Sequence, residues 1–518
     1  MSDPAASVPP VTTPRTTPAT PDPRRWKALT VLALVQFMLI LDVTVVNVAL
    51  PRIQKDLHFS RAGLAWVVDG YVLMAGGFLL LGGRLSDLVG RRRLFLIGTA
   101  LFGAASALAG ASVDSGMLVF SRFAQGLGEA LAAPAALGLV ALLVPDPKER
   151  TKALGVWGGI AGLGGTSGTI ISGALTNIGS GTWRLIFYVN VPVALFAVLI
   201  LPRLADESRA VRAADAPRQR PDILGALTAT AGVSLIVYGF LRAGEVPWGS
   251  GSVVGSLVGG VAVLALFVII EARIDNPLVP LRFFENRTRV TTNAVTLFFS
   301  SAFFTYFYLQ TLYLQQVLHY SPLKAGVSYL PFGVVISLAI GVGTALLPKV
   351  GVKAIMSTGF GMGAVAMFLL TRITVDGSYA SQVLPPMLLL AFGAGMCFPG
   401  FGNASLHEVS QEDASLASGV QNAVQNIGGA IGLAVLATIA TRHIGKAAFA
   451  TAEYAKRAVD GYSDAFLSGA IILAIGAVLV AMFLEQVHVT ADPMAQPGAE
   501  PSSASSSAAG EVLTAPAS

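Results

Sequence analysis

The sequence predicts an all-α membrane protein with fourteen transmembrane helices. Of its 518 residues, 54% are hydrophobic and only 12% are charged, and the mean hydropathy is +0.68. A soluble globular protein carries about 25% charged residues, so this chain needs an apolar solvent around it. Long apolar runs also recur along the chain, and about 20 such residues cross the hydrocarbon core of a bilayer.

The first apolar run follows Arg24, Arg25 and Lys27. It is too long for the apolar part of a signal peptide and lacks a small-residue cleavage site, so we expect it to remain as the first span. The fourteen predicted spans lie near residues 28–50, 64–83, 94–112, 117–143, 154–176, 185–202, 222–242, 251–271, 291–316, 325–347, 351–371, 382–403, 416–440 and 464–485.

Both ends of the chain are expected to be disordered cytoplasmic tails, over residues 1–25 and 486–518. Their Pro-, Ser-, Thr- and Ala-rich composition cannot bury a core. With the N-terminus inside, the inside segments hold 22 Lys and Arg residues and the outside segments hold 11. This bias follows the positive-inside rule and predicts a multi-pass protein of a bacterial cytoplasmic membrane.

The composition argues against several other classes of protein. The single cysteine, Cys397, permits no disulfide within the chain, and the five histidines show no metal-ligand spacing. We therefore expect no cofactor and no metal, and we expect a monomer in the lipid bilayer that binds no nucleic acid. A membrane enzyme or a sensor is disfavoured, because the sequence has no nucleophile elbow and no phosphate-binding loop.

An internal repeat divides the chain into two halves. Gly164, Gly165 and Gly168 recur as Gly428, Gly429 and Gly432, 264 residues later, and the Leu85, Val89, Gly90 pattern recurs as Leu346, Val350, Gly351, 261 residues later. Parallel repeats of this kind build one large class of transporters. The predicted parts are a six-helix bundle at 26–203, a cytoplasmic linker at 204–221, two inserted helices at 222–273, a second linker at 274–290 and a second six-helix bundle at 291–485.

Four ionisable residues lie inside spans of the first half, namely Asp42, Asp69, Arg122 and Glu129. A charge at mid-bilayer costs at least about 2.5–3.5 kcal/mol, so each is a functional candidate. Asp42 and Arg122 lie at similar depths in the outer half of the membrane and could pair. The pair could be structural, or Asp42 or Glu129 could carry protons or bind a cationic substrate.

Arg122, Gln125 and Glu129 share one face of the fourth span. Asp69 lies nearer the outer end of its span, where a hydrogen-bonded structural role is also open. The segment after the second span, Gly83 to Arg93, combines Gly83 and Gly90 with Asp87, Arg91 and Arg92. Arginines alone would be enough to anchor the loop at the membrane surface, so the glycines and the carboxylate need another explanation. We expect this loop to stabilise one conformation of the protein.

These motifs resemble the major facilitator superfamily, and in particular its fourteen-span drug:proton antiporters. The Gly83–Arg93 segment resembles the loop signature of the superfamily, and Leu41 to Pro51, which includes Asn47, resembles the first-span signature of the fourteen-span group. Arg122 to Gly128 is similar to the fourth-span motif, whose arginine is implicated in proton transfer. The resemblance implies the major facilitator fold and a cavity in which Asp42, Asn47, Asp69, Arg122, Gln125 and Glu129 handle protons or substrate.

The fifth span departs from the antiporter motif of that family. Gly164, Gly168 and Gly173 fit the motif, but Thr169 stands where the motif has proline. Proline removes a backbone donor and bends a helix, so its loss predicts a straighter span and looser coupling. The glycines could also serve only as a helix-packing seam.

The ninth span is dense in aromatic residues. Phe303, Phe307 and Gln310 share one face, and Tyr306 and Tyr313 share another, so only one set can line a cavity. Such residues suit an apolar, planar or cationic ligand, or they face lipid and neighbouring helices. Taken together, the sequence predicts proton-coupled efflux of small, mostly apolar or cationic compounds such as antibiotics. The alternative is a transporter of one specific metabolite, in either direction, with loose or no proton coupling.

Overall fold

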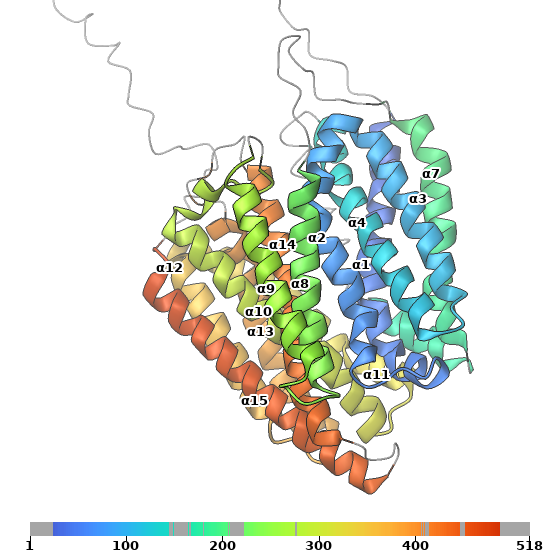
Figure 1. Ribbon diagram of the computed structural model, residues 1–518, viewed down its shortest axis with the longest axis vertical. Coiled ribbons are helices and arrows are strands. Elements are labelled where there is room, and N and C mark those ends of the chain that lie inside the picture. The colour runs from blue at the N-terminus through green and yellow to red at the C-terminus, as the bar shows by residue number, and fades with distance from the viewer. Residues whose placement is uncertain are drawn as a thin grey trace, which may run out of the picture.

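The structure is a computed structural model that is helical throughout the part of the chain that it describes (Figure 1). It describes residues 24–144, 149, 164, 167–179, 181–205, 207, 222–274, 277–405, 407, 409, 414–445 and 451–486. Residues 1–23 and 487–518 of the predicted tails, most of the 204–221 linker and about half of the predicted fifth span therefore lie outside the described residues. The all-helical prediction is confirmed for the rest.

The longer helices are α1 (Arg25–Asp56), α2 (Trp66–Val89), α3 (Arg91–Gly110), α4 (Ser115–Leu143), α7 (Asn190–Leu204), α8 (Ile223–Ala243), α9 (Gly251–Glu271), α10 (Arg287–Leu312), α12 (Leu330–Leu370), α13 (Leu384–Ser405), α14 (Ala414–Ile444) and α15 (Ala452–Phe483). Short helices α6 (Leu185–Tyr188) and α11 (Pro322–Ser328) precede α7 and α12. Residues 167–177 form the described part of the fifth helix.

Twelve helices in the described residues are long and apolar enough to cross a membrane. One of them runs over the 49 residues Pro322–Leu370 and has non-helical backbone at Gly351. At about 1.5 Å per residue it is more than twice as long as the bilayer core is thick, so it has to cross twice. The count of fourteen spans stays a prediction, because residues 154–163 of the fifth are not described.

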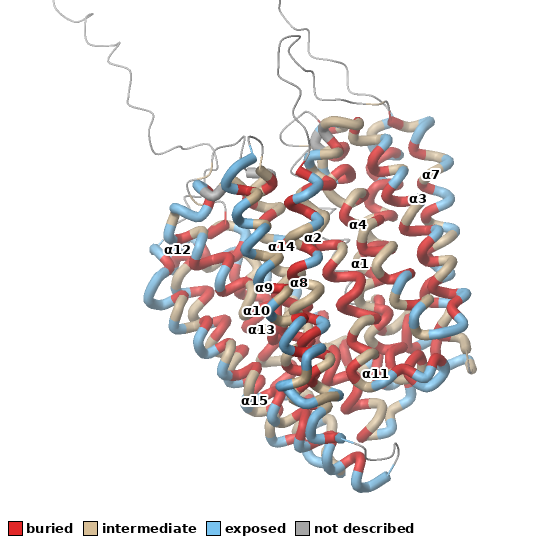
Figure 2. The backbone as a smooth tube through the Cα atoms, viewed as in Figure 1, coloured by how far each residue is buried: buried red, intermediate tan, exposed pale blue. Residues whose placement is uncertain are grey.

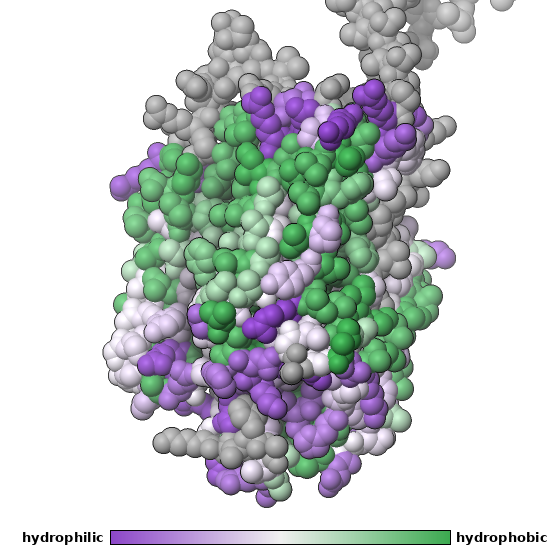
Figure 3. Space-filling model, turned by 90° about the vertical axis from the view of Figure 1, so that its right-hand side faces the viewer, coloured by the Kyte–Doolittle hydropathy of each residue, from purple (hydrophilic) through white to green (hydrophobic). Residues whose placement is uncertain are grey.

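The face of the molecule in Figure 3 carries a broad apolar band between two polar ends. The most apolar stretch of α9 is only 17% buried, whereas that of α10 is 72% buried. Large aliphatic side chains such as Val254, Val258 and Val261 are exposed on α9. Exposed apolar surface of this extent requires lipid, and the buried residues concentrate on helix faces that meet other helices (Figure 2).

The two predicted halves occupy different sides of the molecule (Figure 1). In the first half α4 packs against α2 and α3, and α7 packs against α1 and α3; in the second half α12 packs against α13 and α15, and α10 packs against α14. The α8–α9 pair lies at the seam. Thr230 of α8 packs on Gly77 of α2, and Phe240 of α8 accepts a hydrogen bond from Thr438 of α14 at 2.7 Å.

The two sequence repeats correspond to repeated geometry. Gly90 separates α2 from α3 with φ 113°, ψ 132°, and Gly351 interrupts α12 with φ 79°, ψ 166°. Both backbone conformations are nearly confined to glycine, since a Cβ would clash there. The sequence predicts a loop from Gly83 to Arg93, and this prediction is wrong in extent. Helix α2 continues to Val89, and the chain turns at Gly90 alone.

The second repeat places a glycine seam between the first and fifth helices of each half. A Cβ at Gly164 or Gly168 would meet Ile40 or Thr44 of α1, and a Cβ at Gly428 or Gly432 would meet Leu297 or Ser301 of α10. The Thr44 hydroxyl donates to the Gly164 carbonyl at 3.4 Å. Its counterpart, Ser301, donates to the Gly428 carbonyl at 2.9 Å.

The halves also meet at the end of the molecule opposite to Gly90 and Gly351. Gln316 donates to Gln54 at 3.1 Å, Gln315 donates to the Val48 carbonyl at 2.7 Å, and the Arg61 guanidinium lies 5.3 Å from the Tyr454 ring centre. These contacts close this end between α1 and the second half.

Candidate functional site

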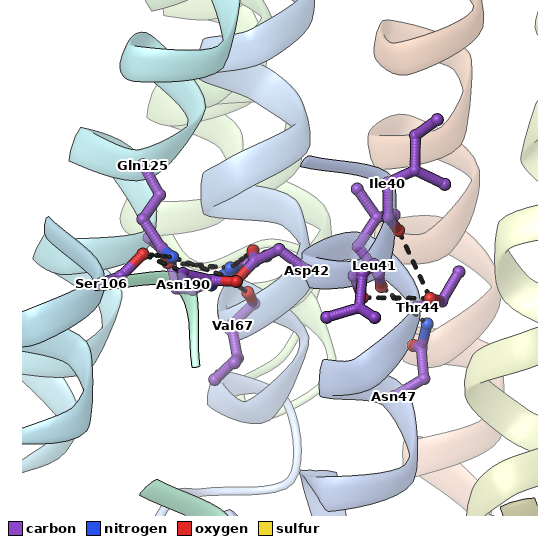
Figure 4. A network of polar contacts seen from close by, with 11 residues as sticks. Ile40, Leu41, Asp42, Thr44, Asn47, Val67, Ser106, Gln125 and Asn190 are labelled. Carbon is purple, nitrogen blue, oxygen red and sulfur yellow. Dashed lines mark hydrogen bonds and ion pairs between the residues drawn. The ribbon is translucent and has the colours of Figure 1, made fainter. Parts of the chain in front are cut away.

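A buried ionic network lies within the first half and is centred on Asp42 of α1 (Figure 4). The Asp42 carboxylate forms an ion pair with Arg122 of α4, and both side chains are almost fully shielded from solvent. Its Oδ1 accepts hydrogen bonds from Gln125 at 3.1 Å and from Asn190 at 2.8 Å. The sequence placed Asp42 and Arg122 at similar depths, where they could pair, and Arg122 and Gln125 on one helix face, and the structure brings all three together.

The Arg122 guanidinium is held by three elements. Its Nε donates to the Val67 carbonyl of α2 at 2.8 Å, and its Nη1 donates to Gln125 at 2.9 Å. The ring of Tyr71 lies 4.3 Å from the guanidinium carbon and adds a cation–π contact. A buried charge pair is stable only when such additional bonds replace water, so the arginine depends on this whole shell.

Two members of the network, Ser106 and Asn190, were missed by sequence reasoning. The Ser106 hydroxyl on α3 accepts from Gln125 at 2.8 Å and from Asn190 at 3.4 Å. Asn190 is the first residue of α7 and is fully buried. The one available signal was an asparagine at the start of an apolar run, since a single serine in a helix rich in Ala and Gly is uninformative.

Asn47 and Asp69 do not join the network, and Glu129 lies beside it. Asn47 donates to the Val43 carbonyl of its own helix at 3.2 Å. Glu129 lies about 6 Å beyond Gln125 along α4 and faces the side chain of Tyr71, whose ring covers Arg122. Asp69 is fully buried, and neither carboxylate oxygen has a hydrogen-bond partner in the described residues. Asp69 shares a face of α2 with Gly76, which packs on Asn426 of α14, so it lies toward the second half.

The charged residues next to Gly90 form hydrogen bonds and an ion pair with neighbouring segments of the first half. Arg91 donates to the Gly138 carbonyl at 3.0 Å, and Arg92 donates to the Ala205 carbonyl at 2.9 Å. The Glu207 carboxylate lies 3.7 Å from Arg92 and would touch any Cβ at Gly90. Gly83 lies within α2 and has free space around it, and the side chain of Asp87 lies outside the described part of the structure.

The antiporter-motif glycines act in helix packing. Gly173 lies against the backbone of Pro322 and Leu323, and the Thr169 carbonyl lies against Gly326, so the fifth helix contacts α11 of the second half. Gly164 and Gly168 pack on α1, as described above. A methyl group at any of these glycines would meet a neighbouring helix, which supports the packing interpretation of the motif.

The aromatic residues of α10 form one cluster with Phe332 of α12, to which both predicted faces contribute. Ring centres of Phe303 and Phe307 are 5.1 Å apart, and Tyr306 stacks on Phe332 at 5.9 Å. Gln310 is buried, and Tyr313 donates to the Thr374 carbonyl at 2.8 Å. None of these five candidates lines the cavity between α10, α13 and α14, so their contact with a substrate stays a prediction; Phe299, one turn earlier, does line it.

The sequence profile of the Major Facilitator Superfamily matches residues 32–433 of the chain. The chain belongs to this superfamily. It is 38% identical to a puromycin resistance protein of Streptomyces alboniger, over 91% of this chain and 94% of that protein. It is 39% identical to a lincomycin resistance protein of Streptomyces lincolnensis, over 81% and 86%, and 33% identical to a cephamycin export protein of Amycolatopsis lactamdurans, over 87% and 91%.

The same fold appears among solved structures. A bacterial homologue of the human lysosomal transporter Spinster, in an inward-facing and occupied conformation, superposes with a TM-score of 0.63 at 17% identity, covering 88% of this chain and 96% of that chain. As a major facilitator protein with apolar helices and bacterial relatives, the chain is a multi-pass membrane transporter of small molecules and not an enzyme.

Proposed function

We propose that this major facilitator protein is a proton-coupled exporter of small antibiotic-like compounds from the bacterial cytoplasm. Its relatives at 30–39% identity are named for resistance to antibiotics or for their export. The observation that carries the coupling is the buried Asp42–Arg122 network, because a carboxylate that is held in a helix bundle by one arginine can exchange its partner for a proton.

The network supports a simple coupling step. In the described state Arg122 neutralises Asp42 and orders Gln125, Asn190 and Ser106 around it. A proton on Asp42 removes the negative charge and leaves Arg122 to its carbonyl and ring contacts. Protonation of Asp42 thus changes the free energy of the pair. A proton can shift a conformational equilibrium only through such a change, because it must stabilise one conformation more than the other.

The proposal includes an arrangement in the membrane. The two six-helix bundles, 26–203 and 291–485, flank the inserted helices within 222–273, which gives fourteen spans with both termini in the cytoplasm. In that orientation Gly90 and Gly351 lie at the cytoplasmic end, and the Gln54–Gln316 and Arg61–Tyr454 contacts close the outer end. The two halves rock about the centre as a monomer, and Asp69 and Glu129 are additional proton carriers.

Transport into inside-out vesicles tests this proposal. Purified protein in liposomes with an imposed pH gradient should accumulate an antibiotic such as puromycin, and a protonophore should abolish the accumulation. The Asp42→Asn variant should still bind the compound but lose dependence on the gradient. If Asp42→Asn and Glu129→Gln both retain gradient-driven accumulation, the coupling residues are assigned wrongly.

A second candidate is an exporter that is dedicated to one metabolite. This candidate is favoured by the names of several relatives, each of which refers to a single antibiotic. Accumulation of one compound only, from a panel of unrelated antibiotics, would distinguish a dedicated exporter from a multidrug exporter.

A further inference from the structure

The second half contains a cavity of about 230 Å³ between α10, α13 and α14. Phe299, Phe398 and Phe401 form its apolar wall, and neutral polar residues of α14, above all Gln421 and Gln425, form the opposite wall. Gly402 and Asn422, at its rim, are exposed, so the cavity opens to the outside of the protein. It lies toward the end of the molecule that the proposed orientation places in the cytoplasm.

The apolar wall is a rigid set of aromatic rings. The ring centre of Phe299 lies 6.0 Å from that of Phe398 and 5.2 Å from that of Phe401, each in an edge-to-face arrangement. Phe299 also stacks on Phe303 at 5.3 Å, which fixes it from behind. Rings held in this way offer flat apolar surface with little entropy left to lose, which favours a flat aromatic ligand.

The polar wall holds a hydrogen-bond acceptor without a partner. Gln421 Nε2 donates to the Thr296 hydroxyl at 2.6 Å, which fixes the orientation of the amide. Its Oε1 is buried and has no hydrogen-bond partner within the described part of the chain. An unsatisfied buried carbonyl costs about 1–3 kcal/mol, so a ligand that donates a hydrogen bond here recovers that free energy.

The cavity has no ionisable residue among those that line it in the described residues. The phenylalanine rings could attract a cation by only about 0.5–2 kcal/mol. Taking an ion out of water without a counter-charge costs several kcal/mol. Of the acids in the spans of the first half, Asp42 is neutralised by Arg122, and neither Asp69 nor Glu129 lines the cavity. The desolvation cost therefore exceeds the attraction, and an ion is rejected.

We propose that this cavity binds an uncharged, flat aromatic group that carries a hydroxyl or amide donor, and that the donor bonds to Gln421. The proposal rests on the export function and deepens it, because it assigns the class of compound that is taken up from the cytoplasm. At about 230 Å³ the cavity is smaller than a whole drug site, so it holds one or two fused rings and leaves the rest of the ligand outside.

Protection of an introduced cysteine tests the proposal independently of transport. Cys397 is buried and is replaced by alanine, and Ser418→Cys then places one thiol at the cavity wall. Maleimide labelling of the reconstituted full-length protein is measured with three uncharged aromatic donors (chloramphenicol, naringenin and tetracenomycin C) and three cations (tetraphenylphosphonium, ethidium and benzalkonium). At least one uncharged compound should slow labelling fivefold or more, and no cation should.

Equal or better protection by any of the cations would overturn the proposal, as would the absence of protection by all three uncharged compounds. A different result would contradict the export function, namely that vesicles containing the same protein accumulate none of the six compounds. Accumulation of a compound that does not protect the introduced thiol would leave export intact and show that this cavity is not the uptake site.

A pair of matched variants tests the role of Gln421. Gln421→Leu should weaken the binding of a protecting uncharged compound about tenfold, and Gln421→Glu should admit cations. Gln382→Glu adds the same charge at a half-buried position where Gln382 accepts a hydrogen bond from the Thr374 amide, outside the cavity. It should leave the preference for uncharged compounds unchanged. If cations bound to the Gln382→Glu variant and not to the Gln421→Glu variant, the role assigned to Gln421 would be contradicted.

Discussion

The first helices of the two halves pack in the same way and carry opposite chemistry. Ile40 and Thr44 of α1 meet Gly164 and Gly168, as Leu297 and Ser301 of α10 meet Gly428 and Gly432. Two residues after Ile40 the chain has Asp42, and two residues after Leu297 it has Phe299. One position thus became the centre of an ionic network in one half and the centre of an aromatic wall in the other.

The difference shows what the shared backbone does and does not determine. The glycine seam fixes the distance and rotation between the first and fifth helices, since a Cβ on either side would clash. The side chain that points away from the seam is then free to vary. In the described part of residues 291–485 no Asp, Glu, Lys, Arg or His side chain is buried, whereas Asp42, Asp69 and Arg122 are buried in the first half.

The strongest way to break the comparison is to remove the cation from the first half. Arg122→Leu should lower the free energy of unfolding by about 3–5 kcal/mol, because it leaves Asp42 buried without a counter-charge. Asp42→Leu combined with Arg122→Leu should recover most of that loss. Thermal unfolding in detergent micelles measures both, and a double variant as unstable as the single one would refute the pairing argument.

Placing the charge of the first half in the second half gives the next largest effect. Phe299→Asp should destabilise the protein by about 2.5–3.5 kcal/mol, since the described residues around it provide aromatic rings and no arginine. Phe299→Leu is the control and should cost less than about 1.5 kcal/mol. Equal unfolding temperatures for the two variants would show that Phe299 lies in water rather than against the rings.

A smaller effect tests the seam that the two halves share. Gly432→Ala would bring a Cβ into overlap with the Cα of Ser301, so a helix has to move, at a cost of about 1–3 kcal/mol. Gly83→Ala is the matched control, because the nearest atom to its Cβ would be Pro134 Cβ at 3.9 Å. The control should be neutral or slightly stabilising in thermal unfolding, and loss of stability in both would mean that space is not the cause.

The smallest expected effect concerns the repeated hydrogen bond. Ser301→Ala removes the 2.9 Å bond to the Gly428 carbonyl and should cost about 0.6 kcal/mol, a typical value for such bonds between membrane helices. Thr44→Ala should cost less, because its bond to the neighbouring helix is 3.4 Å long. Each hydroxyl also donates to its own helix, Thr44 to Leu41 at 3.0 Å and Ser301 to Leu297 at 2.7 Å, so only the bond between helices differs. A larger loss for Thr44 than for Ser301 would reverse the ranking of the two seams.

Sequence reasoning recovered those parts of the site that depend on charge and repeat. Buried charges are rare in apolar helices, so Asp42 and Arg122 stood out, and their similar depth made a pair possible. The repeated Gly90 and Gly351 likewise mark the same backbone turn in both halves. Neutral groups such as Ser106 and Asn190 gave no comparable signal, since one hydroxyl or amide costs little in a helix and is common.

The cavity could not be predicted from the sequence, for a different reason. Phe299, Phe398 and Gln421 come from three helices far apart in the chain, and only the tilt of those helices brings them together. The aromatic run of α10 therefore predicted an aromatic surface but could not show that Phe299 is the ring that lines this cavity. The segment from Gly83 to Arg93 shows the same limit, because glycines and arginines suit both a loop and the end of a helix that stops at Gly90.

The distance between the network of Asp42 and the cavity of Phe299 has an evolutionary consequence. Substitutions at Phe398, Phe401, Gln421 or Gln425 alter the fit of a ligand without touching any hydrogen bond of the Arg122 shell. New resistance spectra can therefore arise by single changes in the second half while the Asp42–Arg122 network, the proposed site of proton coupling, is inherited intact. Selection of this gene against a series of antibiotics should enrich mutations on one side of the molecule only.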